Sequence, residues 1–210
     1  MKTSRERYRT QVRVEIKQYA WEQLATTGVS ALSLNAIAKH VGMSGPALYR
    51  YFASRDDLIT DLVRDAYRSL ADVVQAAAGS GGVAEVAHAI REWALADPQR
   101  YLFVYGTPIP GYRAPGDTTK ISNEIMAVLL DVHSACTEER RPTPFDVHLE
   151  DHREWAGDPS VPSAVLRRAM TFWTRLHGVL SLELAGHFDG MGFDPGVLFA
   201  AELGALVAHE

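Results

Sequence analysis

The chain has 210 residues, of which 47% are hydrophobic and 22% charged, as in an ordinary globular protein with one large domain or two small ones. No apolar stretch approaches the roughly 20 residues that span a bilayer, and no apolar segment follows the charged N-terminus as it would in a signal peptide. The lone Cys136 excludes a disulfide within the chain. We therefore expect a cytoplasmic protein without a membrane-embedded part.

The net charge of −5 is unevenly distributed. Residues 1–55 hold nine Lys and Arg against three Glu, a net charge of +6, and the remaining residues carry −11. A basic end on an acidic body indicates that this end faces a polyanion, although a solvated basic surface would give the same count.

The hydrophobic periodicity predicts helices nearly throughout and no strand. In the first helix, apolar residues recur at steps of three and four until Gly28 ends it: Val12, Ile16, Tyr19, Ala20 and Leu24. The basic tail before Val12, with Arg5, Arg7 and Arg9, either contacts a polyanion or is a disordered, solvated tail.

Two short helices and a long one follow. Ser33 is the expected N-cap of the second helix, which Gly42 ends. Ser44 is the expected N-cap of the third, with Pro46 in its first turn. The spacing of Ser54 and Asp57 is that of a capping box, which opens the fourth.

Beyond the glycine-rich residues 79–82, we expect helices at about 83–96, 98–105, 118–136, 161–187 and 195–208. Cys136 is expected to be buried in the helix at 118–136. Residues 106–117 and 138–160 are rich in Pro, Gly and charge, and are expected to form loops. The predicted fold class is all-α, with three N-terminal helices, a connecting helix and a larger helical body.

The second and third helices have helix-turn-helix proportions. In such a unit Leu48 and Phe52 face inward beside Ile37, Ala38, Val41 and Leu58. The N-terminal tip of the third helix favours a phosphate, and small residues there let the backbone approach base edges. Arg50 can bond guanine or phosphate, and Tyr49 either reaches a phosphate or packs under the first helix.

Residues 10–62, with "SLNAIAKHVGMSGPALYRYFASRDDLITDL", resemble the TetR-type bacterial transcriptional regulators. The resemblance implies a DNA-binding domain at 1–55, with helix 4 connecting from residue 54 to a ligand-sensing and dimerisation domain at 56–210. It also implies contacts to double-stranded DNA from Ser33, Ser44, Gly45, Pro46, Ala47, Tyr49, Arg50, Tyr51 and Arg55. The alternative is a helical turn packed in an unrelated bundle.

The body is similar to one branch of this family in "DPQRYLFVYGTPIPGY" and in the Trp-x-x-x-His-Gly motif of "FWTRLHGVLSLELAGHF". Each aromatic residue there can belong to a core, but collectively they predict a pocket for a small, mostly apolar or aromatic ligand. The expected pocket residues are Trp93, Tyr101, Phe103, Tyr105, Met126, His133, Phe172, Trp173 and His177.

Small residues alternate with leucines in the last two helices. The resemblance implies that these helices pair with their twofold copies in a homodimer, which would read a palindromic operator. The expected interface residues are Gly178, Leu184, Ala185, Leu198, Ala201, Gly204, Ala205 and Ala208. Packing within one chain is the alternative.

No catalytic residue, metal ligand or cofactor is expected. Residues 148–152 nearly copy the His-x-x-Glu-His zinc pattern, but Asp151 stands where Glu is required and the segment is expected to be a solvated loop. The predicted function is a ligand-responsive repressor, active at the bacterial nucleoid. The alternatives are a helical enzyme or carrier whose N-terminal helices are structural, and a regulator that responds to a protein partner.

Overall fold

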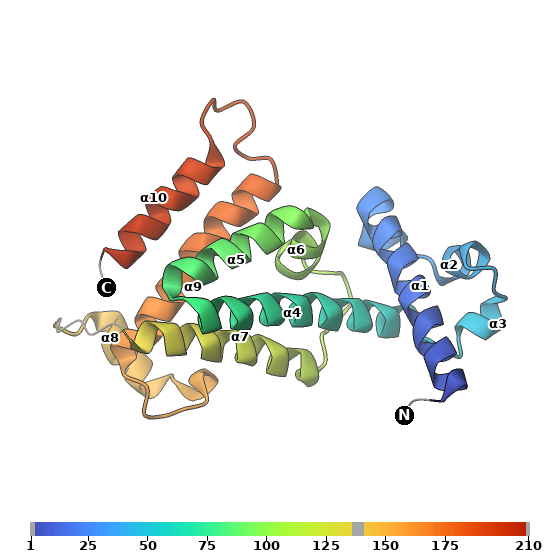
Figure 1. Ribbon diagram of the computed structural model, residues 1–210, viewed down its shortest axis with the longest axis horizontal. Helices are drawn as coiled ribbons and strands as arrows, with labels where there is room; N and C mark the ends of the chain where they lie inside the picture. Colours follow the sequence, from blue (N-terminus) through green and yellow to red (C-terminus); the bar gives the residue numbers. More distant parts are fainter. Residues whose placement is uncertain (1–2, 136–140, 209–210) are drawn as a thin grey trace. The chain divides into compact units, whose positions relative to one another are not determined.

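The computed structural model describes residues 3–135 and 141–208, and in these residues the fold is all-helical as predicted (Figure 1). Two compact units divide the chain. Unit 1 comprises residues 1–65 and 107–115, and unit 2 comprises residues 66–106 and 116–210. The division falls inside helix α4 (Arg55–Ser80), which starts in unit 1 and continues into unit 2. The functional boundary expected after residue 55 stays a prediction.

Unit 1 contains α1 (Ser4–Thr27), a 3-10 turn (Val29–Ala31), α2 (Leu34–His40), α3 (Gly45–Leu48) and the start of α4. Residues 4–11 are exposed but helical, so a disordered tail is wrong for the described residues, and helix α1 starts earlier than expected. The reason is a capping box. Thr3 Oγ1 accepts from the Glu6 N–H at 3.2 Å, and the Glu6 carboxylate accepts from the Thr3 N–H at 2.7 Å.

The turn between α2 and α3 is a Schellman motif. The Met43 N–H donates to the Ala38 carbonyl at 2.8 Å, and the Gly42 N–H donates to the Lys39 carbonyl at 3.4 Å. Gly42 has φ +69°, which a side chain would strain, so this glycine sets the direction in which α3 leaves α2.

The core of unit 1 forms as predicted. Ile37, Leu48 and Leu58 have no accessible surface, and Phe52 is 2% exposed, whereas Val41 is only half-buried. Helix α3 is a single turn. After it, the Tyr51 and Phe52 N–H groups both donate to the Leu48 carbonyl, at 2.8 and 3.2 Å, and this continues the backbone as a tight turn.

Unit 2 contains the rest of α4, α5 (Val83–Ala96), α6 (Pro98–Tyr105), α7 (Gly116–Ser134), α8 (Pro144–Asp151), α9 (Ser163–Leu184) and α10 (Pro195–Val207). Figure 1 shows α9 and α10 running side by side, and both contact α5. Cys136 lies outside the described residues. None of the described helices has the length and apolar character that a membrane span requires.

One arginine contacts α9 and α10 of unit 2 from α5. Arg91 on α5 donates to both carboxylate oxygens of Glu183 on α9, at 2.5 and 2.8 Å, and both side chains are largely buried. The Arg91 guanidinium also lies 4.9 Å from the ring centre of Phe199 on α10. Three helices therefore meet at one cation.

The expectation of a loop at 138–160 is wrong for residues 144–151, which form α8, and for the 3-10 turn Glu154–Ala156. Thr143 and Asp146 form a capping box, and Pro144 occupies the first turn. Leu149 is buried against α9. The pattern in residues 148–152 therefore lies mainly on this helix. In the described residues no three His, Cys, Asp or Glu side chains are grouped to hold a metal ion.

Candidate nucleic-acid interface and ligand site

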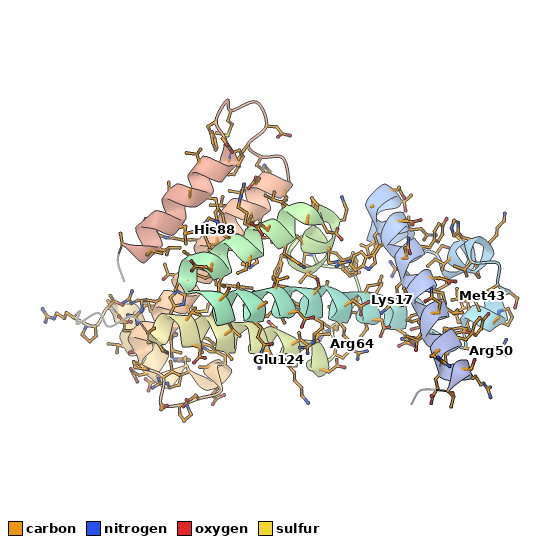
Figure 2. The ribbon with its side chains drawn as sticks, in the orientation of Figure 1. Lys17, Met43, Arg50, Arg64, His88 and Glu124 are labelled. Atoms are coloured by element: carbon orange, nitrogen blue, oxygen red, sulfur yellow. The ribbon has the colours of Figure 1, made fainter. Side chains whose placement is uncertain are left out.

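Helix α3 and the turn after it form a surface, which we call the recognition surface: Ser44, Gly45, Pro46, Ala47, Tyr49, Arg50 and Tyr51. Gly45, Ala47 and Tyr51 are half-buried, and the others are exposed. Arg50 is exposed and Tyr49 keeps 49% of its surface accessible. Figure 2 places Arg50 beside the N-terminal half of α1, in agreement with the hydrogen bond from Arg9 Nη2 to the Arg50 carbonyl at 3.5 Å. The contacts of these residues with DNA stay a prediction.

Two serines cap the helices of this surface. Ser33 Oγ accepts from the Ala36 N–H and Ser44 Oγ accepts from the Ala47 N–H, each at 3.3 Å. Each cap uses the hydroxyl oxygen as an acceptor, so the O–H can still donate to a phosphate oxygen. Capping and phosphate binding are therefore compatible.

Arg55 has a structural position. Its Nη2 donates to the Val29 carbonyl at 2.5 Å and its Nε to the Leu32 carbonyl at 3.3 Å. The guanidinium thereby ties the 3-10 turn to the first residue of α4. The contact from Arg55 to phosphate stays a prediction.

Arg13 on α1 is a residue that the sequence did not single out for this surface. Its Nη1 donates to the Tyr51 carbonyl at 2.8 Å, and its Nη2 pairs with Asp61 on α4 at 2.6 Å. The guanidinium also lies 4.3 Å from the ring centre of Phe52. Arg13 therefore connects α1, the recognition surface and α4, and it lines a cavity of about 400 Å³ beside Tyr49 and Arg50.

Part of the basic charge of this end is neutralised internally. Lys17 pairs with Asp65 at 2.5 Å and lies 3.7 Å from Asp61, which also pairs with Arg13. Unit 1 carries eleven Lys and Arg against seven Asp and Glu, a net charge of +4. The excess that remains still favours a polyanion.

In unit 2 the structure brings four of the expected pocket residues together. The His177 ring centre lies 4.4 Å from that of Tyr105, 4.0 Å from that of Trp173 and 5.6 Å from that of Tyr101. Tyr67 on α4 contacts Tyr105 edge-on at 6.0 Å, and the sequence did not indicate it. We call these five side chains the aromatic cluster.

The other expected pocket residues are placed differently. Trp93 is buried and borders the cluster at Tyr101, 6.4 Å between ring centres, and its Nε1 donates to Ser69 Oγ at 3.0 Å. Phe172 has no accessible surface and contacts His133, whose Nδ1 donates to the Leu129 carbonyl at 2.7 Å. Phe103 and Met126 are half-buried.

Helix α10 buries one face and exposes an apolar face. Phe199 and Leu203 pack inward. Of the expected interface residues, those exposed are Gly178, Ala185, Ala201, Gly204 and Ala208, and those half-buried are Leu184, Leu198 and Ala205. Larger exposed apolar side chains lie on the same two helices and the loop between them: Leu182, Met191, Phe193, Val197 and Val207. An apolar surface of this kind is typical of an interface.

Comparisons with known proteins decide the family. Residues 17–62 match the bacterial regulatory proteins of the tetR family, and residues 83–206 match the tetracyclin repressor-like C-terminal domain. The chain belongs to the TetR family. TetR-family proteins are DNA-binding transcriptional regulators, so the recognition surface lies in the DNA-binding part of the chain.

Relatives within the TetR family cover nearly the whole chain. The HTH-type transcriptional regulator Rv1816 of Mycobacterium tuberculosis is 36% identical over 95% of this chain and 92% of its own. The regulatory protein SCO4313, known from a crystal structure, has 63% sequence identity to this chain. The match covers 98% of this chain and 100% of SCO4313, and the two structures superpose with a TM-score of 0.91. A tetR-family protein from Rhodococcus RHA1 shares the fold, with a TM-score of 0.59, 14% identity and coverage of 94% and 95%.

Arg13→Met is expected to weaken binding to a TetR-family operator about tenfold more than Lys17→Met. Both changes remove one positive charge from the same helix, one turn apart. Arg13 loses its ion pair with Asp61, and Lys17 loses those with Asp65 and Asp61, all on α4. Only Arg13→Met leaves the Tyr51 carbonyl without its charged donor. The lost hydrogen bond contributes about 1 to 3 kcal/mol to holding the turn after α3 in place. Titrations of both variants with operator DNA measure the difference. Equal losses would show that Arg13 contributes charge alone.

Proposed function

We propose that this regulator is a homodimeric repressor, which reads a palindromic operator through its recognition surface and is released by a small ligand. The observation that carries the proposal is the exposed Tyr49 and Arg50, which follow a well-packed helix-turn-helix on a unit of net charge +4. A regulator of this kind acts in the cytoplasm, at the nucleoid when bound to DNA. Its ligand is small and mostly apolar.

The dimer would form through the exposed apolar face of α9 and α10. Small side chains along both helices allow a close approach of a second copy, and larger ones such as Val197, which is 67% exposed, would become buried. A twofold dimer would present two recognition surfaces to successive half-sites, about one helical turn or a small multiple apart.

A short segment links ligand sensing to the DNA-binding unit. Helix α6 ends at Tyr105 in unit 2, and residues 107–115 continue from it into unit 1. There the Tyr112 hydroxyl lies 3.1 Å from the Thr60 hydroxyl on α4. A ligand that favours one position of α6 would bias this contact and with it the start of α4, which is a population shift between two conformations.

The test is selection of a bound sequence from random DNA by the purified protein, followed by titration of that sequence across a salt series. We expect a palindromic site, bound at least about a thousandfold more tightly than unrelated DNA. The logarithm of the binding constant should fall against the logarithm of salt by about 0.9 per phosphate neutralised. Failure to enrich any sequence would contradict the proposal and favour an enzyme or carrier function for unit 2.

A further inference from the structure

Two polar atoms in the aromatic cluster are sealed from solvent without a partner. Within the part of the chain that the structure describes, neither Tyr105 Oη nor His177 Nε2 makes a hydrogen bond, and both atoms are inaccessible to water. A buried polar group left unpaired costs about 1 to 3 kcal/mol. Because native structures pair nearly all such groups, two in one cluster require an explanation.

The neighbouring hydroxyl shows that the cluster can satisfy its own polar groups. Tyr101 lies one helical turn before Tyr105 on α6, and its Oη lies 2.9 Å from both His177 Nδ1 and Ser181 Oγ on α9. One side of the His177 imidazole is thus held by the fold, while the opposite nitrogen has no partner. The rings of Tyr105 and Trp173 both contact the imidazole, so the two unpaired atoms belong to side chains that touch each other.

Both unpaired groups are neutral at pH 7. Burial lowers the pKa of His177 to about 4, so the imidazole carries no charge. Burial, and to a smaller extent the charges of Tyr67 and Tyr101, raises the pKa of Tyr105, so its hydroxyl keeps its proton. A charged ligand group placed here would lose its hydration and meet only neutral partners, which is costly.

We propose that Tyr105 Oη and His177 Nε2 are the paired anchor of a ligand site, which binds a neutral hydroxyl or carboxamide on an aromatic molecule. Such a group both donates and accepts, so it satisfies the phenol and either tautomer of the imidazole. The rings of Tyr67, Tyr105 and Trp173 form the apolar surface against which the body of the ligand packs. This inference rests on the proposed ligand response and specifies the chemistry of its site.

The first test compares Tyr105→Phe with Tyr101→Phe in the absence of any ligand. Each change removes one hydroxyl from α6, and the two positions are one turn apart. Removing the unpaired Tyr105 hydroxyl should leave the Tm unchanged or raise it by about 2 to 4 °C, whereas removing the bonded Tyr101 hydroxyl should lower it by a similar amount. A lowered Tm for Tyr105→Phe would mean that its hydroxyl already has a partner, such as an ordered water, and would overturn the proposal.

The second test measures the binding of four fragments of similar size by calorimetry: benzamide, toluene, benzoate and benzylammonium. Benzamide should bind about fivefold more tightly than toluene, the gain from one hydrogen bond, and at least tenfold more tightly than either ion. Tyr105→Phe should reduce the difference in affinity between benzamide and toluene, and it should leave the affinity for toluene unchanged. Equal affinities for benzamide and the ions, or no binding of any fragment, would overturn the proposal.

Operator binding by the unliganded protein is measured in parallel. Intact operator binding without the fragment preference would refute the anchor alone. Selective binding of benzamide by a protein that enriches no DNA sequence would refute the repressor function and leave the anchor supported.

Discussion

Arg50→Ala is expected to lower operator affinity by about fivefold to a hundredfold, because a bidentate contact from arginine to guanine contributes about 1 to 3 kcal/mol of discrimination. The Arg50 side chain is exposed, and among the described residues its guanidinium makes no hydrogen bond or ion pair, so the fold does not use it. Its backbone carbonyl is held by Arg9, which keeps the position in place after the change. The titration is made at constant salt, with helical content and Tm measured on the same sample.

The matched control is Arg113→Ala. Arg113 is exposed, carries the same charge and belongs to the same unit, but it lies in the segment 107–115 and not on the recognition surface. Its loss should change operator affinity by no more than about twofold, because salt screens the attraction between one distant charge and the DNA. If the two variants bind alike, Arg50 does not contact the operator. If Arg50→Ala weakens all sequences equally and reduces the salt slope by about one, Arg50 contacts a phosphate and not a base.

The helix-turn-helix could be predicted from the sequence because local signals fix it. Ser33 and Ser44 cap their helices within three residues, and Gly42 supplies the one left-handed backbone position that the turn requires. These features depend on neighbours in the chain, so a single sequence displays them. The inward positions of Leu48 and Phe52 follow from the same short periodicity.

The contacts of Arg13 could not be predicted in this way. Its partners Tyr51 and Asp61 lie 38 and 48 residues away, and a charge on the exposed side of a helix pattern does not indicate which distant carbonyl it reaches. The same limit applies to the expected pocket. Tyr105 and His177 meet only because α6 packs on α9, and sequence reasoning placed them in one group with Phe172 and His133, which contact each other in the core.

Helix α8 is hard to predict for a different reason, because its sequence signal is local but unusual. The capping box Thr143–Asp146 has Asp where Glu or Gln is common, and it stands between prolines in a highly charged stretch. Composition alone indicated a loop. Asp146 is only 3% exposed, so this charged residue is part of a packed helix and not of a solvated loop.

Asp146→Asn is expected to destabilise unit 2 by about 2 to 3 kcal/mol, the contribution of hydrogen bonds to a buried charged group. One carboxylate oxygen accepts from the Thr143 N–H and hydroxyl, at 2.7 and 2.6 Å, and the other pairs with Arg167 Nε on α9 at 2.9 Å. The amide can replace neither the charge nor both acceptors, so α8 loses its N-terminal cap and its ion pair to α9. Urea denaturation at pH 7 measures the loss.

The effect should depend on pH in a defined direction. Burial raises the pKa of Asp146, but the hydrogen bonds from Thr143 and the pairing with Arg167 outweigh it, so the pKa lies below its ordinary value. A group with a depressed pKa contributes stability above its unfolded pKa of about 4, and this contribution is lost as the pH falls through the folded value. The difference in Tm between wild type and Asp146→Asn should therefore shrink below about pH 4.

Asp158→Asn is the control for this pH dependence. Asp158 also accepts hydrogen bonds, from the Ser160 N–H at 2.8 Å and the Ser160 hydroxyl at 2.7 Å, but it lies in an exposed turn. Solvent screens its interactions, so its replacement should change the Tm little at any pH. If both variants lose the same stability, or if the loss in Asp146→Asn is constant down to pH 3, the buried ion pair does not hold α8 on α9, and the packing of Leu149 must do so instead.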